Sequence, residues 1–70
     1  MKKNFNERLR EIRLEKGLNQ KEIAKILEIS VTCYAGYEQD YRQPDLKMLT
    51  KICLAFGVSA DYLLGLCDDY

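Results

Sequence analysis

Histidine is absent from the 70-residue sequence. Its absence removes the base of histidine-dependent nucleophilic catalysis, the ligands of Cys₂His₂ zinc sites and the side chain that titrates near neutral pH. The three cysteines, Cys33, Cys53 and Cys67, are 20 and 14 positions apart and form no C-x-x-C half of a zinc or redox site. We therefore expect no metal, no cofactor and no enzymatic activity.

Cysteine is also sparse, and its count is odd, which suits a reducing cytoplasm. We interpret the three thiols as small apolar side chains, because cysteine is among the most buried residue types. A redox sensor is the alternative, and Cys67, near the C-terminus, is its strongest candidate.

Long hydrophobic runs and phosphate-binding loops are missing as well. The longest apolar run, residues 52–56, has five residues, whereas a membrane helix needs ~20. Polar residues such as Asn6 and Glu7 follow the first lysines, where a signal peptide would be apolar. The four glycines form no G-x-G-x-x-G or Walker loop. We expect a cytoplasmic protein with no membrane helix and no nucleotide site.

The net charge of zero, from 11 basic and 11 acidic residues, argues at first against a nucleic-acid partner. The distribution of charge weakens this objection. Residues 1–25 hold eight basic and four acidic side chains, a net charge of +4, while residues 26–50 and 51–70 each have a net charge of −2. Such a polarised chain is compatible with modest, salt-sensitive binding to nucleic acid through lysines of its basic N-terminal third, such as Lys2, Lys3 and Lys21.

Capping residues and apolar spacing divide the chain into five short helical segments. Asn4 with Glu7, and Asn19 with Glu22, have the spacing of a capping box. A serine or aspartate begins each of the other three segments. The predicted helices span residues 5–16, 20–27, 31–39, 46–56 and 60–64.

These segments and their short connections predict an all-α fold, a compact five-helix bundle. Segments 20–27 and 31–39 are joined by a very tight turn. Two short helices joined in this way form a helix-turn-helix, whose second helix lies in the DNA major groove.

Several spaced motifs carry a family resemblance. They are Gly17-Leu18-Asn19-Gln20, Glu22-Ile23-Ala24, Ile29-Ser30, Tyr37-Glu38, Arg42-Gln43-Pro44-Asp45 and Gly57-Val58-Ser59-x-Asp61-Tyr62-Leu63-Leu64-Gly65. With these motifs the sequence resembles the Cro/phage-repressor type (XRE) family of helix-turn-helix proteins. The resemblance implies a lambda-repressor-like DNA-binding domain at residues 5–65, a short C-terminal tail at 66–70, and the function of a small, sequence-specific transcriptional repressor.

The resemblance also assigns the DNA contacts. It places Val31, Thr32 and Gly36 at the main base-contact positions of recognition helix 31–39, and Ala35 falls on the same outward face. Tyr34 and Tyr37 point inward and are interpreted as packing residues. The phosphate contacts implied by the family, together with the basic charge expected beside them, are Gln20, Lys21, Tyr41, Arg42 and Gln43.

Two features bear on structure. Arg13 and Glu38 resemble a pair that joins the first helix to the end of the recognition helix, and two unrelated surface charges are the alternative. Glu28 replaces the family's usual glycine at the turn, where a left-handed non-glycine residue is strained by about 1–2 kcal/mol.

The base-reading face departs from the family pattern, because it offers only the Thr32 hydroxyl for hydrogen bonding to bases. Two explanations for a glycine at position 36 stay open: a close approach of its backbone to DNA or to a partner, and chance. This poor face supports a second hypothesis, a protein-interaction module such as an antitoxin-like or regulator-binding domain with little DNA affinity.

One recognition helix reads few base pairs, so the DNA-binding hypothesis requires a homodimer on two half-sites. Tyr62, Leu66 and Tyr70, at or after the last helix, are candidate dimer contacts. A frayed tail is the alternative.

Overall fold

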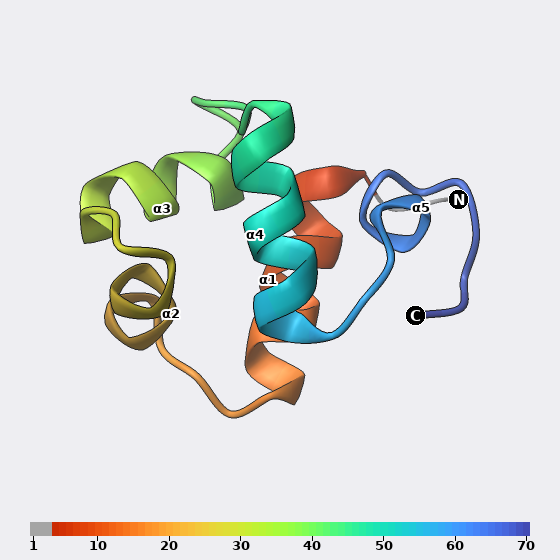
Figure 1. Cartoon of the computed structure of the whole chain (residues 1–70), viewed down its shortest axis with the longest axis horizontal. Helices are drawn as coiled ribbons and strands as arrows, with labels where there is room; N and C mark the ends of the chain where they lie inside the picture. The colour runs from red at the N-terminus through yellow and green to blue at the C-terminus, as the bar shows by residue number, and fades with distance from the viewer. Residues whose placement is uncertain (1–3) are drawn as a thin grey trace.

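The computed structural model describes residues 4–70, and over this range it contains five α-helices and no strand (Figure 1). The predicted all-α class is therefore confirmed. The helices are α1 (Phe5–Glu15), α2 (Gln20–Leu27), α3 (Val31–Glu38), α4 (Leu46–Phe56) and α5 (Ala60–Leu63). Three of the predicted ends differ, each by one residue, because Lys16, Gln39 and Leu64 are C-caps instead of helical residues.

The predicted caps begin the helices as the sequence indicates. Asn4 accepts a hydrogen bond from the Glu7 backbone N–H, and the Glu7 carboxylate accepts one in return from the Asn4 N–H. Asn19 and Glu22 form the same reciprocal box at α2, at 2.7 and 2.9 Å. Each box satisfies two backbone donors that the first helical turn leaves open.

Glu28 adopts the left-handed conformation at the turn between α2 and α3, with φ 61° and ψ 40°. This conformation lets the Ile29 N–H donate to the Ala24 carbonyl at 3.0 Å, which closes the end of α2. The turn therefore has the geometry that glycine usually provides, with a glutamate in its place. A second left-handed residue, Asp40 (φ 62°), follows α3 and was not expected from the sequence.

The core lies where α1, α2, α3, α4 and α5 converge. Ala24 is almost fully buried, and α2 packs directly on α3, as its small side chain at the helix crossing predicts. Tyr34 and Tyr37 are buried and meet edge to face, so their interpretation as packing residues is confirmed. The fully buried large side chains are Leu9, Ile12, Ile23, Leu27, Tyr34, Ile52, Phe56 and Leu63.

The last residues pack against the domain and are not a frayed end. The Arg8 guanidinium donates to the carbonyl oxygens of Tyr62 (3.1 Å) and Cys67 (2.8 Å) and to the Asp68 carboxylate (2.7 Å). The Tyr70 ring meets the Tyr62 ring edge to face. Tyr62 is only 7% exposed, so its side chain belongs to the core and its assignment as a dimer contact is wrong.

The three thiols are free and half-buried. Burial raises the pKa of Cys53 above its ordinary value. The Cys67 thiol donates to the Asp69 carbonyl oxygen at 3.3 Å. None of the helices described between residues 4 and 70 combines the length and the hydropathy of a membrane-spanning segment.

Candidate nucleic-acid interface

Helix α3 presents one face to solvent and the opposite face to the core. Thr32 is exposed, Val31 is 43% exposed and Ala35 is half-buried, so all three are accessible from one side. Tyr34 and Tyr37 lie on the opposite face. Figure 1 shows α3 at one end of the molecule, with α2 beside it and α5 at the other end.

A shallow, open hollow of about 590 Å³ lies along the accessible face of α3. Seven of the residues that the sequence assigned to DNA contact line this one hollow, together with Gln39, which the sequence analysis missed. Gln39 has a sequence signal, since it stands at four-residue spacing from Ala35 on the same helical face. The lining residues are Gln20, Val31, Thr32, Ala35, Gly36, Gln39, Tyr41 and Arg42.

A second hollow adjoins the first at Val31 and carries two positive charges. It measures about 550 Å³ and is lined by Lys21, Ala24, Lys25, Ile29 and Val31. Lys21 was assigned from the sequence. Lys25 was not, although it stands one helical turn after Lys21 on α2. Both lysines are exposed.

Gln43 lies apart from the other predicted contact residues. It lines a small apolar hollow of about 190 Å³ with Phe5, Asp40, Pro44, Leu49 and Leu64. Tyr41 and Arg42, its neighbours in the loop, are exposed and line the hollow on α3 instead. The loop 39–45 therefore divides its polar side chains between two sides.

Gln20 faces inward more than the sequence suggested. Its amide Nε2 donates to Glu38 Oε1 at 3.1 Å, and the residue is half-buried. Glu38 also accepts from Arg13, with Nε–Oε2 at 2.6 Å and Nη2–Oε1 at 3.1 Å. A further Arg13 nitrogen, Nη1, donates to the Leu18 carbonyl at 2.9 Å. Gln20 thus connects the first turn of α2 to a buried ion pair.

Arg13 and Glu38 are 8% and 9% exposed, so the pair that the resemblance placed here is a buried one. Burial alone would raise the pKa of Glu38, but polar interactions with Arg13, Tyr34 and Gln20, together with the positive charge of Arg13, lower it below its ordinary value. The hydrogen bond to Glu38 raises the pKa of Arg13. Both side chains therefore stay charged over the physiological range.

Gly36 differs from the other residues assigned to the outward face of α3, because it is buried. The aliphatic stem of Arg42 covers it: a Cβ at position 36 would lie 3.1 Å from Arg42 Cδ and 3.2 Å from Cγ. Gly36 therefore lines the hollow beneath the Arg42 stem, and its assignment as a base contact stays a prediction. A side chain at this helical position would meet the Arg42 stem of the same chain.

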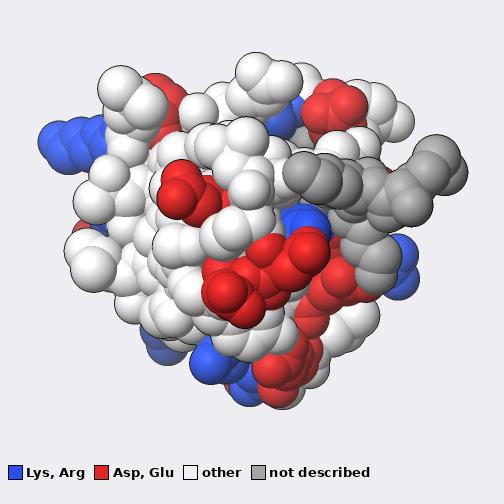
Figure 2. All heavy atoms as spheres, turned by 90° about the vertical axis from the view of Figure 1, so that its right-hand side faces the viewer, with Lys and Arg blue, Asp and Glu red and all other residues white. Residues whose placement is uncertain are grey.

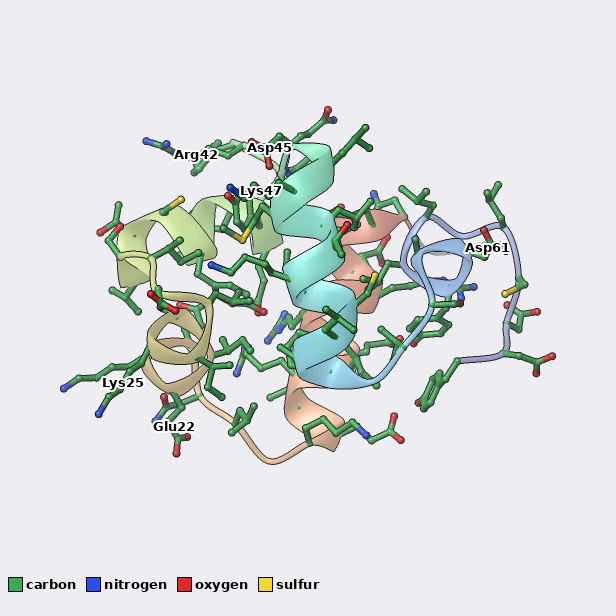
Figure 3. All side chains as sticks on the ribbon, viewed as in Figure 1. Glu22, Lys25, Arg42, Asp45, Lys47 and Asp61 are labelled. Carbon is green, nitrogen blue, oxygen red and sulfur yellow. The ribbon has the colours of Figure 1, made fainter. Side chains whose placement is uncertain are left out.

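Exposed negative charge gathers at the end of the molecule opposite α3. Figure 2 looks onto the α5 end and shows acidic side chains clustered on it, and Figure 3 places Asp61 there. Asp68 and Asp69 of the tail are also exposed. Arg8 and Arg13 are buried, so these two charges of the basic N-terminal third do not reach the surface. Lys2 and Lys3 lie outside the described residues.

Comparison with known proteins agrees with this geometry. Residues 9–63 match the helix-turn-helix family. The transcriptional regulator ImmR of Bacillus subtilis is 44% identical over 62 residues, which cover 89% of this chain and 49% of ImmR. The chain spans about half the length of curated relatives that it matches.

Solved structures show the same fold. The P22 c2 repressor, in complex with a synthetic operator, superposes with a TM-score of 0.83 at 26% identity, over 89% of this chain and 94% of that one. The restriction-modification controller protein C.AhdI from Aeromonas hydrophila gives a TM-score of 0.80 at 30% identity, over 86% and 91% of the two chains. The lambda-repressor-like fold is therefore confirmed. The chain belongs to the helix-turn-helix family, in its Cro/phage-repressor (XRE) branch.

Proposed function

We propose that this protein is a small transcriptional repressor that binds a double-stranded DNA operator and places α3 in the major groove. The observation that carries the proposal is the open hollow along α3, whose lining includes Val31, Thr32 and Arg42. Regulators of the same family, among them an operator-bound repressor, support it.

The proposed base contacts are few. The Thr32 hydroxyl is the one hydrogen-bonding group among the assigned base contacts, and the apolar side chains of Val31 and Ala35 suit the methyl group of thymine. Phosphate contacts are therefore expected to supply most of the affinity. The assigned phosphate contacts are Gln20, Lys21, Tyr41, Arg42 and Gln43, to which the structure adds Lys25 as a candidate.

A homodimer is part of the proposal, because two recognition helices one helical turn apart read a longer site than one helix does. An apolar hollow of about 490 Å³ supports it; its lining includes Leu46, Cys53, Leu54 and Val58 of the α4–α5 region and no charged residue. Leu54 is 79% exposed. We expect Leu54→Lys to shift the protein from dimer to monomer in analytical ultracentrifugation. A monomeric wild type at micromolar concentration would contradict the dimer.

The test of the function is the salt dependence of binding to duplex DNA, both random and genomic. Counterion release predicts that log K falls against log salt with a slope of about −0.9 for each phosphate contacted. The complex with a specific DNA site should persist in the presence of competitor DNA. Absence of any binding at about 50 mM salt would overturn the proposal.

Two variants separate the roles of the interface residues. Arg42→Ala should weaken binding to all sequences alike and reduce the salt slope by about 0.9. Thr32→Ala should change the preference at one base position and leave the salt slope unchanged. If Thr32→Ala lowered every affinity equally, the assignment of the reading face would be wrong.

The second candidate function is a protein-interaction module with little DNA affinity. The observation that favours it is the apolar character of the exposed face of α3, where Val31 and Ala35 flank a single hydroxyl. This hypothesis predicts binding that changes little with salt and requires a protein partner. The salt titration therefore distinguishes the two functions directly.

A further inference from the structure

Gly36 and Arg42 make a contact that connects the recognition helix to the loop after it. The position of Gly36 on α3 is buried beneath Arg42, whose Cβ, Cγ and Cδ atoms would lie 3.5, 3.2 and 3.1 Å from a Cβ at position 36. Distances of 3.1–3.2 Å are tighter than most carbon–carbon contacts in proteins. The Arg42 stem therefore occupies the space that a side chain at position 36 would fill.

Backbone hydrogen bonds also hold the loop against Gly36. The N–H groups of Tyr41 and Arg42 both donate to the Gly36 carbonyl oxygen, at 2.9 and 3.2 Å. Asp40, with φ 62°, turns the chain back over the end of α3 so that these bonds form. The backbone position from which the Arg42 side chain extends is thus fixed relative to α3.

The direction of the Arg42 side chain matters for the interface. Figure 3 shows Arg42 extending from the loop above α3, on the side away from α4. It lines the same hollow as Val31 and Thr32. A glycine inside a helix lowers the stability of the fold relative to alanine. A functional role of the contact with Arg42 would account for a glycine at this position.

We propose that Gly36 is a positioning residue for Arg42: its missing side chain lets the Arg42 stem cross α3 and carry the guanidinium over the DNA-reading hollow. The inference rests on the proposed DNA-binding function. It assigns Gly36 an indirect role, in which the glycine acts through Arg42 and makes no contact of its own with DNA. Arg42 in turn supplies a phosphate contact at a position fixed relative to α3.

A double-mutant cycle on duplex DNA tests this role. The four proteins are the wild type, Gly36→Leu, Arg42→Ala and the double variant, each titrated between about 50 and 200 mM salt. We expect each single variant to lose about tenfold in affinity at the lower salt concentration, the order of one charge-assisted hydrogen bond. Each should also have a salt slope smaller by about 0.9. The double variant should bind no more weakly than Arg42→Ala.

Three controls keep the result specific to the contact. Thr32→Leu adds bulk elsewhere on the same face, so its effect should add to that of Arg42→Ala. Arg42→Lys keeps the charge, and its salt slope should match that of the wild type. The melting temperature of Gly36→Leu verifies that the variant folds: leucine has a higher helix propensity than glycine, which offsets the displacement of the exposed Arg42 stem, so we expect little change.

Additive losses in the cycle would show that position 36 meets DNA directly, and would overturn the positioning role while leaving the proposed function intact.

An NMR experiment reports the contact without DNA: we expect a nuclear Overhauser effect between the Gly36 Hα and Arg42 Hδ protons, absent in Gly36→Leu. Its absence in the wild type would overturn the inference. If the wild type failed to bind DNA, the proposed function and this role would fall together.

Discussion

Arg13 of α1 and Glu38 at the end of α3 form a two-point ion pair inside the domain, with Nε–Oε2 at 2.6 Å and Nη2–Oε1 at 3.1 Å. Gln20, the first residue of α2, donates to the same carboxylate. Three helices therefore meet at one charged group. The orientation of α3, and with it the orientation of the reading face, depends on this polar junction as well as on the apolar core.

Glu38→Gln should destabilise the domain, because it removes the charge that Arg13 requires while leaving the guanidinium buried. Hydrogen bonds to charged groups contribute about 1.5–3 kcal/mol, and we expect a loss in the free energy of unfolding of that order. Urea denaturation followed by circular dichroism measures it. Glu28→Gln is the matched control, since it neutralises an exposed carboxylate and should change stability much less. A loss equal to that of the control would contradict a structural role for the pair.

The same carboxylate predicts acid sensitivity. The pKa of Glu38 is lower in the folded protein than its ordinary value of 4.5, so the stabilising contribution of Glu38 is complete above that value and is lost as pH falls through the folded pKa. We expect the free energy of unfolding of the wild type to fall below about pH 4.5. Glu38→Gln should show a shallower fall over the same range. Parallel pH profiles for the two proteins would contradict the assignment.

Local signals in the sequence were sufficient to predict the helices. The reciprocal boxes of Asn4 with Glu7 and of Asn19 with Glu22 depend on residues three positions apart, and the structure contains both. The inward direction of Tyr34 and Tyr37 followed from helical spacing in the same way. Such interactions are visible in one sequence because their partners are close along the chain.

Contacts between distant residues were not predictable in this way. The bonds from Arg8 to Tyr62 and Cys67 span 54 and 59 positions, and no periodicity indicates them. The contact of Gly36 with Arg42 is short in sequence but depends on the left-handed turn at Asp40, which carries no glycine to mark it. The family resemblance predicted that Arg13 and Glu38 form a pair. Their burial could not be predicted, because it depends on the packing of α1 on α3.

Tyr34→Phe should leave stability unchanged or increase it by up to about 1 kcal/mol. The Tyr34 hydroxyl is buried beside the Arg13–Glu38 pair and makes no hydrogen bond of ordinary geometry within the described residues, and an unsatisfied buried polar group is costly. Burial raises the pKa of Tyr34, and the neighbouring Glu38 carboxylate raises it further. The control is Tyr37→Phe, which removes the acceptor of the Cys33 thiol and should not stabilise. Thermal unfolding of both variants makes the comparison, and a clear loss in Tyr34→Phe would reveal a partner for the hydroxyl.

Glu28→Gly should stabilise the domain, because Glu28 occupies the left-handed conformation that glycine adopts without strain. Relief of about 1 kcal/mol corresponds to a rise of roughly 4–8 °C in melting temperature for a domain of this size. Glu28→Ala removes the same charge but keeps a Cβ, so it should produce no such rise. If the two variants had equal melting temperatures, the stabilisation would come from the loss of charge and not from relief of backbone strain.

Arg8→Met should release the C-terminal residues from the domain. The Arg8 guanidinium makes the hydrogen bonds to the Cys67 carbonyl and to the Asp68 carboxylate, and it lies over the Tyr62 ring at 4.7 Å from its centre. Methionine retains an apolar stem but donates no hydrogen bond. We expect faster chymotrypsin cleavage after Leu66 and faster amide exchange at residues 66–70.

Arg10→Met is the matched control for this release, since Arg10 is an exposed arginine on the same helix. It should leave both the cleavage rate and the amide exchange as in the wild type. The DNA affinity of Arg8→Met should stay within about twofold of the wild type, because the tail lies at the opposite end of the molecule from α3 (Figure 1) and beyond the range of screened charge at ~0.15 M salt. A large change in affinity would mean that the Arg8 junction also determines the orientation of the recognition helix.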